Sequence, residues 1–312
     1  MTESDTNEVV NDEAALEEEF NLIPERRSTY VPFGHFNDVR AIINSNRFVP
    51  IYITGLSGNG KTMMVEQVCA VLQRECVRVN VTGETDEDDL LGGFRLKDGE
   101  TVWEDGPAVT AMRRGAVLLL DEVDLGTFKL MCLQPMLEGN PVYLKKINKV
   151  VHPKAGFTVV ATANTKGQGS MSGKFIGTNV MNEAFLERFS FTLEQEYPTK
   201  RVESNILKKV LKENGTEDAA FVDLLVRWAD LTRKSYFDGA CSEIISTRRL
   251  VHICQAFAIF GQKREKAIQL CLKRFDDETK NSFMEFYEKI DETIGSDKDK
   301  DEEEEPAKST EW

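Results

Sequence analysis

Apolar residues follow two different patterns along this chain, and the change between them comes near residue 198. Before it, short apolar runs rich in β-branched residues alternate with stretches of helical spacing. Strands that alternate with helices in this way favour a doubly wound, parallel, five-stranded α/β sheet. The strands are predicted at 48–54, 77–81, 116–120, 157–163 and 189–193.

Helical spacing appears between these strands and throughout the rest of the chain. In the first part it predicts helices at 36–43, from the end of a Gly-rich loop to about 74, at 107–114, at 127–137, and a short one ending at 187–188. Beyond 198 only helices are predicted, at 202–211, 219–234, 247–260 and 280–290. That second part is expected to form a small, all-α lid domain.

Two β-hairpins are expected as insertions in the α/β part. Asp98-Gly99 separates two alternating runs, 94–97 and 100–103, and an Asp-Gly pair in that setting is a strong signal for a tight turn. A second hairpin is predicted at about 142–152.

The formal net charge of the 312-residue chain is −14, but its acidic residues are concentrated at the two ends. Residues 1–25 contain nine Asp or Glu and no Lys or Arg, and 291–312 contain ten acidic residues and three Lys. Such runs are typical of solvated, disordered ends, with a docking arm for a basic partner as the alternative. The predicted divisions are an acidic arm at 1–29, an α/β domain at 30–197, a helical domain at 198–290 and an acidic tail at 291–312.

The remaining composition narrows the class of protein. The six cysteines show no Cys-x-x-Cys spacing, which favours free thiols in a reducing compartment. No apolar run is long enough to span a bilayer and no signal peptide is recognisable, so we expect a cytoplasmic protein without membrane contact. Scattered histidines do not predict a transition-metal site.

A phosphate-binding loop lies between the first predicted strand and the helix that follows it. The motif Gly-x-x-x-x-Gly-Lys-Thr is formed by Gly55, Leu56, Ser57, Gly58, Asn59, Gly60, Lys61 and Thr62. Its glycines let backbone N–H groups turn toward a phosphate, and the helix N-terminus adds positive potential. Lys61 is expected to bind the β- and γ-phosphates of ATP, and the Thr62 hydroxyl to bind Mg²⁺.

An acidic pair follows the third predicted strand, Leu118-Leu119-Leu120, and suits nucleotide hydrolysis. Such chemistry needs one carboxylate for the Mg²⁺ ion and a second one to polarise the attacking water. We assign Asp121 to the first role and Glu122 to the second.

Two further residues lie at the ends of predicted elements. Asn164 ends the fourth strand, where ligands bind in doubly wound sheets, and its amide can orient the same water; an ordinary turn asparagine is the alternative. Arg188 suits an arginine finger directed at a neighbouring subunit's γ-phosphate. The alternative is a surface ion pair with Glu187 or Glu183.

Arg248 is predicted to contact the γ-phosphate. Ser246 is a plausible N-cap, so Arg248 and Arg249 fall in the first turn of a helix, where a cation opposes the helix dipole. An arginine kept at this unfavourable position indicates that its guanidinium binds an anion. Arg249 is the weaker candidate for this role.

In this order, the motifs resemble those of an AAA+ ATPase of the MoxR-like branch, a P-loop NTPase group with hairpin insertions at these two places. Within that branch the chain is similar to the CobS-type ATPase subunit of aerobic cobaltochelatase, and related genes occur in bacteriophages. The resemblance covers about residues 30–290. The matching sequence segments are Val77-Arg78-Val79-Asn80, Ala161-Thr162-Ala163-Asn164-Thr165, Gly177-Thr178, Ala229-Asp230-Leu231-Thr232-Arg233 and Phe286-Tyr287-Glu288.

The resemblance implies roles for particular residues. Asn164 would be sensor 1, Arg188 the finger acting in trans, and Arg248 sensor 2, in a ring of six subunits with ATP at the interfaces. Gly34 and His35 would lie at the adenine pocket. The chain departs from the family at 246–248, which reads Ser-Thr-Arg in place of Ser-Pro-Arg, and we expect no added docking domain within these residues.

The expected function is Mg²⁺-dependent ATP hydrolysis that remodels a protein partner, in the manner of a cobaltochelatase motor subunit. Three alternatives remain open. They are a MoxR-type chaperone for an unrelated client such as a viral protein, a nucleotide-gated scaffold with little turnover, and a nucleic-acid motor. Lysines 145, 146 and 149 near the second hairpin turn are too few for the broad basic stripe that nucleic-acid binding requires.

Overall fold

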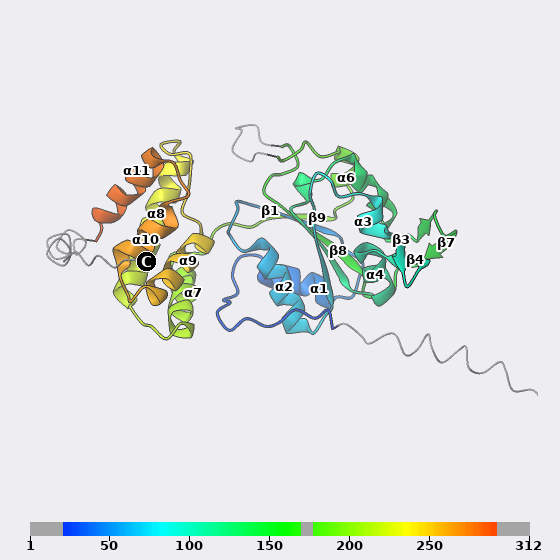
Figure 1. Cartoon of the computed structure of the whole chain (residues 1–312), viewed down its shortest axis with the longest axis horizontal. Helices are drawn as coiled ribbons and strands as arrows, with labels where there is room; N and C mark the ends of the chain where they lie inside the picture. The colour runs from blue at the N-terminus through cyan, green and yellow to red at the C-terminus, as the bar shows by residue number, and fades with distance from the viewer. Residues whose placement is uncertain (1–20, 170–176, 292–312) are drawn as a thin grey trace, which may run out of the picture.

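A computed structural model of the chain describes residues 21–169 and 177–291. Five parallel strands form one sheet in the order β2-β5-β8-β1-β9, which confirms the predicted α/β class (Figure 1). The strands are β1 (Ile51–Thr54), β2 (Cys76–Asn80), β5 (Val117–Asp121), β8 (Thr158–Ala163) and β9 (Phe191–Glu194).

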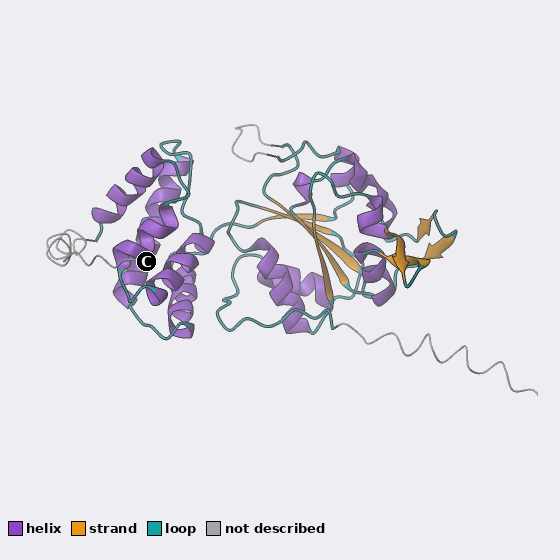
Figure 2. Cartoon of the chain, in the orientation of Figure 1, coloured by secondary structure: helices purple, strands orange, loops and turns teal. Residues whose placement is uncertain are grey.

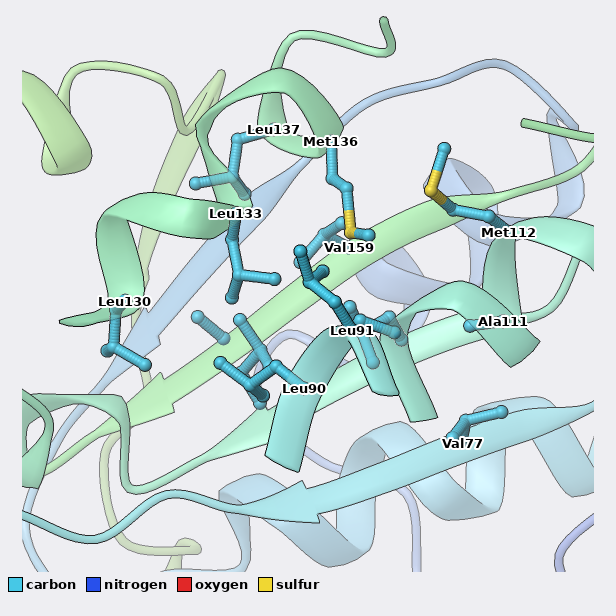
Figure 3. Close-up of a cluster of buried hydrophobic side chains, with 14 of the residues drawn as sticks. Val77, Leu90, Leu91, Ala111, Met112, Leu130, Leu133, Met136, Leu137 and Val159 are labelled. Carbon is cyan, nitrogen blue, oxygen red and sulfur yellow. The ribbon is translucent and has the colours of Figure 1, made fainter. Parts of the chain in front are cut away.

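Alternate side chains of the strands enter two separate hydrophobic cores. Ile51, Ile53 and Val160 point to one face, where α1 (Phe36–Asn44) and α2 (Lys61–Leu72) cover them. Successive side chains of a strand point to opposite faces, so Tyr52 and Val159 belong to the other core. That core is covered by α3 (Glu87–Leu91), α4 (Pro107–Arg114) and α5 (Gln134–Leu137), as Figure 3 shows.

Both predicted hairpins are present, each as a separate two-stranded sheet (Figure 2). The first pairs β3 (Gly92–Lys97) with β4 (Glu100–Asp105), and the second pairs β6 (Val142–Leu144) with β7 (Lys149–Val151). At the first turn Asp98 has φ 53° and Gly99 has φ 85°, the left-handed conformations that a tight two-residue turn requires.

Two local predictions need correction in the segments that flank β5. The helix predicted at 127–137 is a 3₁₀ helix over Phe128–Leu133 followed by α5. Pro135 lies in the first turn of α5 and has no N–H to donate to a preceding turn, so a continuous α-helix cannot form there. The short helix α3 was not predicted, although Asp86 and Asp89 form its capping box.

The rest of the chain is helical, and it packs around its own core. Its helices are α7 (Lys200–Glu213), α8 (Ala219–Phe237), α9 (Thr247–Ile259), α10 (Arg264–Leu272) and α11 (Asp277–Glu288), and short α6 (Glu183–Leu186) precedes β9. Trp228 is fully buried at the centre and donates to the Phe283 carbonyl at 2.9 Å. Helix α10 was not predicted from the sequence, because its apolar residues do not fall on a single face.

The expected acidic arm and tail lie mostly outside the described residues. Residues 21–29, at the end of the arm, are not free but lie along α2. There Gln67 donates to the Glu25 carbonyl at 2.8 Å and accepts from the Arg27 N–H at 2.9 Å. These backbone contacts extend the folded part to residues before 30.

Among the described residues, no helix combines the length and apolar character that crossing a membrane requires. All six cysteines are free thiols, as predicted, although Cys132, Cys241 and Cys271 are only partly buried.

Candidate nucleotide site

A cavity of about 430 Å³ lies between the carboxyl ends of the strands and the helical part, a size typical of small-molecule sites. The phosphate-loop residues 57–62 line it together with Asp121, Glu122, Asn164 and Arg248. Its apolar lining comes from Tyr30, Val31, Phe33, Met63, Ile206, Val210 and Val251. A cavity with both kinds of wall fits an amphipathic ligand such as a nucleotide.

The phosphate loop has the backbone shape that its glycines allow. Gly58 and Gly60 have φ angles of 73° and 91°, in the left-handed region that favours glycine. A Cβ atom at Gly58 would also come within 2.7 Å of the Ser246 Oγ. Buried Asn59 donates to the Gln195 carbonyl at 2.5 Å and so anchors the loop to the segment after β9.

Lys61 lies at the centre of the loop and is almost fully buried. Its ammonium donates to the Gly55 and Leu56 carbonyls at 2.6 and 3.1 Å, and to the Asn164 Oδ1 at 3.2 Å. The loop and the end of β8 therefore meet at this ammonium group.

Asp121 and Thr62 also lie side by side. The Thr62 hydroxyl donates to the Asp121 Oδ1 at 2.6 Å, and the Thr162 hydroxyl donates to the same atom. Arg78 donates to the Asp121 Oδ2 at 2.6 Å and to the Glu66 Oε1 at 3.0 Å. Mg²⁺ prefers hard oxygen ligands, so the Thr62 hydroxyl and the Asp121 carboxylate are a chemically suitable pair for it.

Glu122 has an unusual backbone conformation. Its φ is 57°, which is uncommon for a residue other than glycine, and its N–H donates to the Thr162 Oγ1 at 3.3 Å. The turn leaves the Glu122 side chain exposed at the cavity, whereas the preceding Asp121 is buried. The two neighbouring carboxylates thus have different surroundings, as two different roles require.

Asp124 supports the site from below the cavity lining and was not predicted from the sequence. Its carboxylate is completely buried, and Oδ2 accepts from the N–H groups of Asn164 and Thr165 at 3.0 and 2.9 Å. The Thr165 hydroxyl donates to the same oxygen at 2.9 Å. Asp124 therefore fixes the backbone just after β8, which carries the Asn164 side chain.

The two predicted arginines lie in different places. Arg248 lies in the first turn of α9, as expected, with Ser246 as N-cap. Within the described part of the chain, its guanidinium has no hydrogen-bond or ion-pair partner, and it lines the cavity. Arg249 is instead turned toward the Phe275 ring, 5.8 Å from its centroid.

Arg188 does not line the cavity of its own chain. It forms an ion pair with Glu138, with 2.8 Å between Nε and Oε1, and it also donates to the Ala184 carbonyl. The partner is thus neither of the glutamates considered from the sequence.

Gly34 and His35 lie behind the cavity wall, and the preceding residue, Phe33, lines it. The His35 N–H donates to the Gln195 Oε1 at 3.2 Å, and a Cβ atom at Gly34 would lie 2.4 Å from that Gln195 side chain. Both residues therefore pack against the segment after β9, close to the phosphate loop's anchor.

Burial shifts the titration of Lys61. It lowers the pKa of the ammonium from 10.5 to about 8, although the Asp124 and Asp121 carboxylates act in the opposite direction. Below about pH 8 the folded and unfolded chains both hold this proton, and between 8 and 10.5 mainly the unfolded chain holds it. The contribution of Lys61 to the free energy of unfolding therefore increases with pH across that window.

We expect ATP binding to weaken as the pH rises through about 8. Above that pH Lys61 is neutral in the empty site, and it must take up a proton before it can bind a phosphate as a cation. The Kd should increase roughly 10-fold or more between about pH 7.5 and 9.5. Calorimetry near pH 8.5, in two buffers of different ionisation enthalpy, should detect proton uptake on binding. Identical heats in both buffers and a constant Kd would contradict this expectation.

Comparison with known proteins yields one family and several relatives. Residues 50–189 match the AAA domain of the dynein-related subfamily. The chain is 33% identical, over 68% of its length, to the aerobic cobaltochelatase subunit CobS of a Sinorhizobium species, and it covers 66% of that subunit. An uncharacterized protein of Staphylococcus haemolyticus is 28% identical over 73% of the chain and 85% of its own length.

A solved structure with the same fold is the RuvB Holliday junction branch migration motor of Thermotoga maritima. It aligns with a TM-score of 0.50 over 80% of this chain and 71% of its own, at 14% sequence identity. At that identity the likeness concerns the fold alone.

Proposed function

Because the chain belongs to the dynein-related, MoxR-like branch of the AAA+ ATPases, we propose that it couples Mg²⁺-dependent ATP hydrolysis to the remodelling of a protein partner. The observation that best supports ATP hydrolysis is that Lys61, Thr62, Asp121, Glu122 and Asn164 line one cavity together. A phosphate-binding cation, two possible Mg²⁺ ligands and an exposed carboxylate are the groups that phosphoryl transfer to water needs.

Each side chain has a proposed role in that reaction. Lys61 binds the β- and γ-phosphates. Thr62 and Asp121 would hold a Mg²⁺ ion, which would supply positive charge against the phosphates. Glu122 accepts the proton of the attacking water while Asn164 orients that water. The water oxygen bonds to the γ-phosphorus, the bond to the bridging oxygen breaks, and ADP and phosphate leave.

The two arginines would complete the charge balance around the γ-phosphate. Arg248 acts from the helical part of the same chain. Arg188 acts on the nucleotide of a neighbouring subunit, which is consistent with its position outside its own cavity. This assignment requires a neighbouring subunit, and we propose a closed ring of six.

The similarity to CobS favours a motor subunit of a cobaltochelatase-type complex, in which another subunit would bind the metal. A MoxR-type chaperone for another client is the second candidate, because the family match specifies an AAA domain and no particular client. A nucleotide-gated scaffold with little turnover would use the same binding residues.

Phosphate release by the purified chain tests the proposal. We expect turnover that depends on both ATP and Mg²⁺ and that a Lys61→Ala variant lacks, because a phosphate-binding lysine cannot be replaced by solvent in a buried site. ATP binding with no phosphate release, alone and with candidate partners, would favour the scaffold instead. A Lys149→Ala variant, altered on the second hairpin and outside the cavity, is the matched control.

A further inference from the structure

A buried ion pair lies inside the helical part, directly beneath the start of α9. Arg233 of α8 donates from Nη1 and Nη2 to the two carboxylate oxygens of Glu203 on α7, at 3.0 and 2.8 Å. The side chains are 11% and 1% exposed, respectively. Two parallel charge-assisted bonds fix the relative orientation of both groups, so this pair joins two helices in a defined geometry.

The same pair holds the segment that leads into α9. The Thr247 hydroxyl donates to the Glu203 Oε1 at 2.6 Å, and Arg233 Nε donates to the Ile245 carbonyl at 3.0 Å. The residues on both sides of the N-cap Ser246 are therefore bound to the ion pair. Arg248 follows immediately, so the position of its backbone depends on these bonds.

One aromatic residue connects the pair with the phosphate loop. The Arg233 guanidinium lies over the Tyr197 ring, 4.1 Å from its centroid, and the Tyr197 hydroxyl donates to the Ser57 carbonyl at 2.8 Å. A second connection comes from the Arg248 N–H, which donates to the Gly58 carbonyl at 3.3 Å. Both connections end on adjacent residues of the phosphate loop.

Stability alone is a weak explanation for this arrangement. Taking two charges out of water costs about as much as their attraction returns, and apolar residues of similar volume often stabilise a core as well or better. An ion pair with fixed hydrogen bonds does, however, fix the orientation of the segments that it joins. Here it fixes the orientation of the first turn of α9, from which Arg248 reaches the cavity.

We propose that Tyr197, Glu203, Arg233 and Thr247 are positioning residues that set Arg248 over the phosphate loop, so that the γ-phosphate of a bound nucleotide is recognised. This inference rests on the proposed ATP site and adds the residues through which the helical part senses the nucleotide. None of the four is assigned to touch the phosphates; they act through Arg248 and through the carbonyl of Ser57.

Two isosteric substitutions test the proposal against a merely structural role. Thr247→Val removes the hydroxyl that binds Glu203, and Thr232→Val removes another buried hydroxyl, which binds the Ala229 carbonyl of its own helix. Affinities for ATP and ADP, measured with fluorescent analogues, give the preference for the γ-phosphate. We expect Thr247→Val to lower that preference roughly 10-fold, as loss of a hydrogen bond to a charged group implies, and Thr232→Val to leave it unchanged.

Two further variants strengthen the test. Thr247→Ser should restore the preference for ATP, because it restores the hydroxyl. Tyr197→Phe, which keeps the ring beneath Arg233, should lower it roughly threefold without lowering the melting temperature more than Thr232→Val does.

The proposal is overturned if the Thr247→Val and Thr232→Val chains show the same preference, or if the wild-type chain does not distinguish ATP from ADP. A wild-type chain that prefers ATP but never hydrolyses it would refute the proposed ATPase function alone, and the affinity ratios would still decide the positioning role.

Discussion

A Glu122→Gln chain should bind ATP as tightly as the wild type and hydrolyse it roughly 10²- to 10⁴-fold more slowly. The amide has nearly the shape of the carboxylate but cannot accept a proton from the attacking water. Because the Glu122 side chain is exposed at the cavity and its backbone keeps the φ of 57° in either variant, the fold should not change. Single-turnover phosphate release, together with a binding titration, measures the two effects separately.

The control is Glu84→Gln, which removes the same charge from another exposed glutamate outside the cavity. It should have wild-type turnover. If Glu122→Gln retains its rate, a different group accepts the proton and the assignment of Glu122 fails. If it loses ATP binding as well, Glu122 stabilises the bound ATP before the reaction and does not act specifically in the chemical step.

An Arg188→Ala chain should also lose turnover, by roughly 10³-fold, if its guanidinium completes the site of a neighbouring subunit. The decisive measurement is a mixture with Lys61→Ala chains, which are inactive for a different reason. In a mixed ring, an intact Lys61 of one chain can meet an intact Arg188 of the next. An equal mixture should therefore recover about a quarter of the wild-type rate, the share of interfaces at which both are present.

The ion pair between Arg188 and Glu138 offers a matched control. Glu138→Gln breaks that pair and leaves the arginine in place, and a partly exposed pair contributes little to stability. Its activity should stay close to that of the wild type. Equal losses in Arg188→Ala and Glu138→Gln, with no recovery on mixing, would show that the arginine has a structural role within its own chain.

The sequence was sufficient to predict the sheet and the gathering of Lys61, Thr62, Asp121 and Asn164. Buried parallel strands are continuous apolar runs, and their carboxyl ends meet at one edge, so residues placed there by sequence alone become neighbours. The turn at Asp98-Gly99 was predictable for a similar reason, because its chemistry is entirely local.

Other parts of the site depend on contacts between distant segments, which local patterns do not reveal. The last residue of β5 and two of the three residues after it are acidic, and nothing local indicates that Asp124 would be the one buried against the backbone of Asn164. Likewise, the apolar wall includes Phe33 rather than Gly34, because the segment after β9 covers the latter. The ion pair of Glu203 and Arg233 joins residues 30 positions apart on two helices, and their spacing gives no sign of it.

The cavity lies between two parts of the chain that pack separately, the sheet with its two cores and the helical part around Trp228. A nucleotide that fills this cavity would lie between the two parts of the chain and contact both of them. In the proposed site the terminal phosphate is shared by Lys61 of the phosphate loop and Arg248 of the helical part, so its loss removes a contact on both sides of the cavity. Under the proposed function, hydrolysis would therefore change how the helical part is held against the sheet.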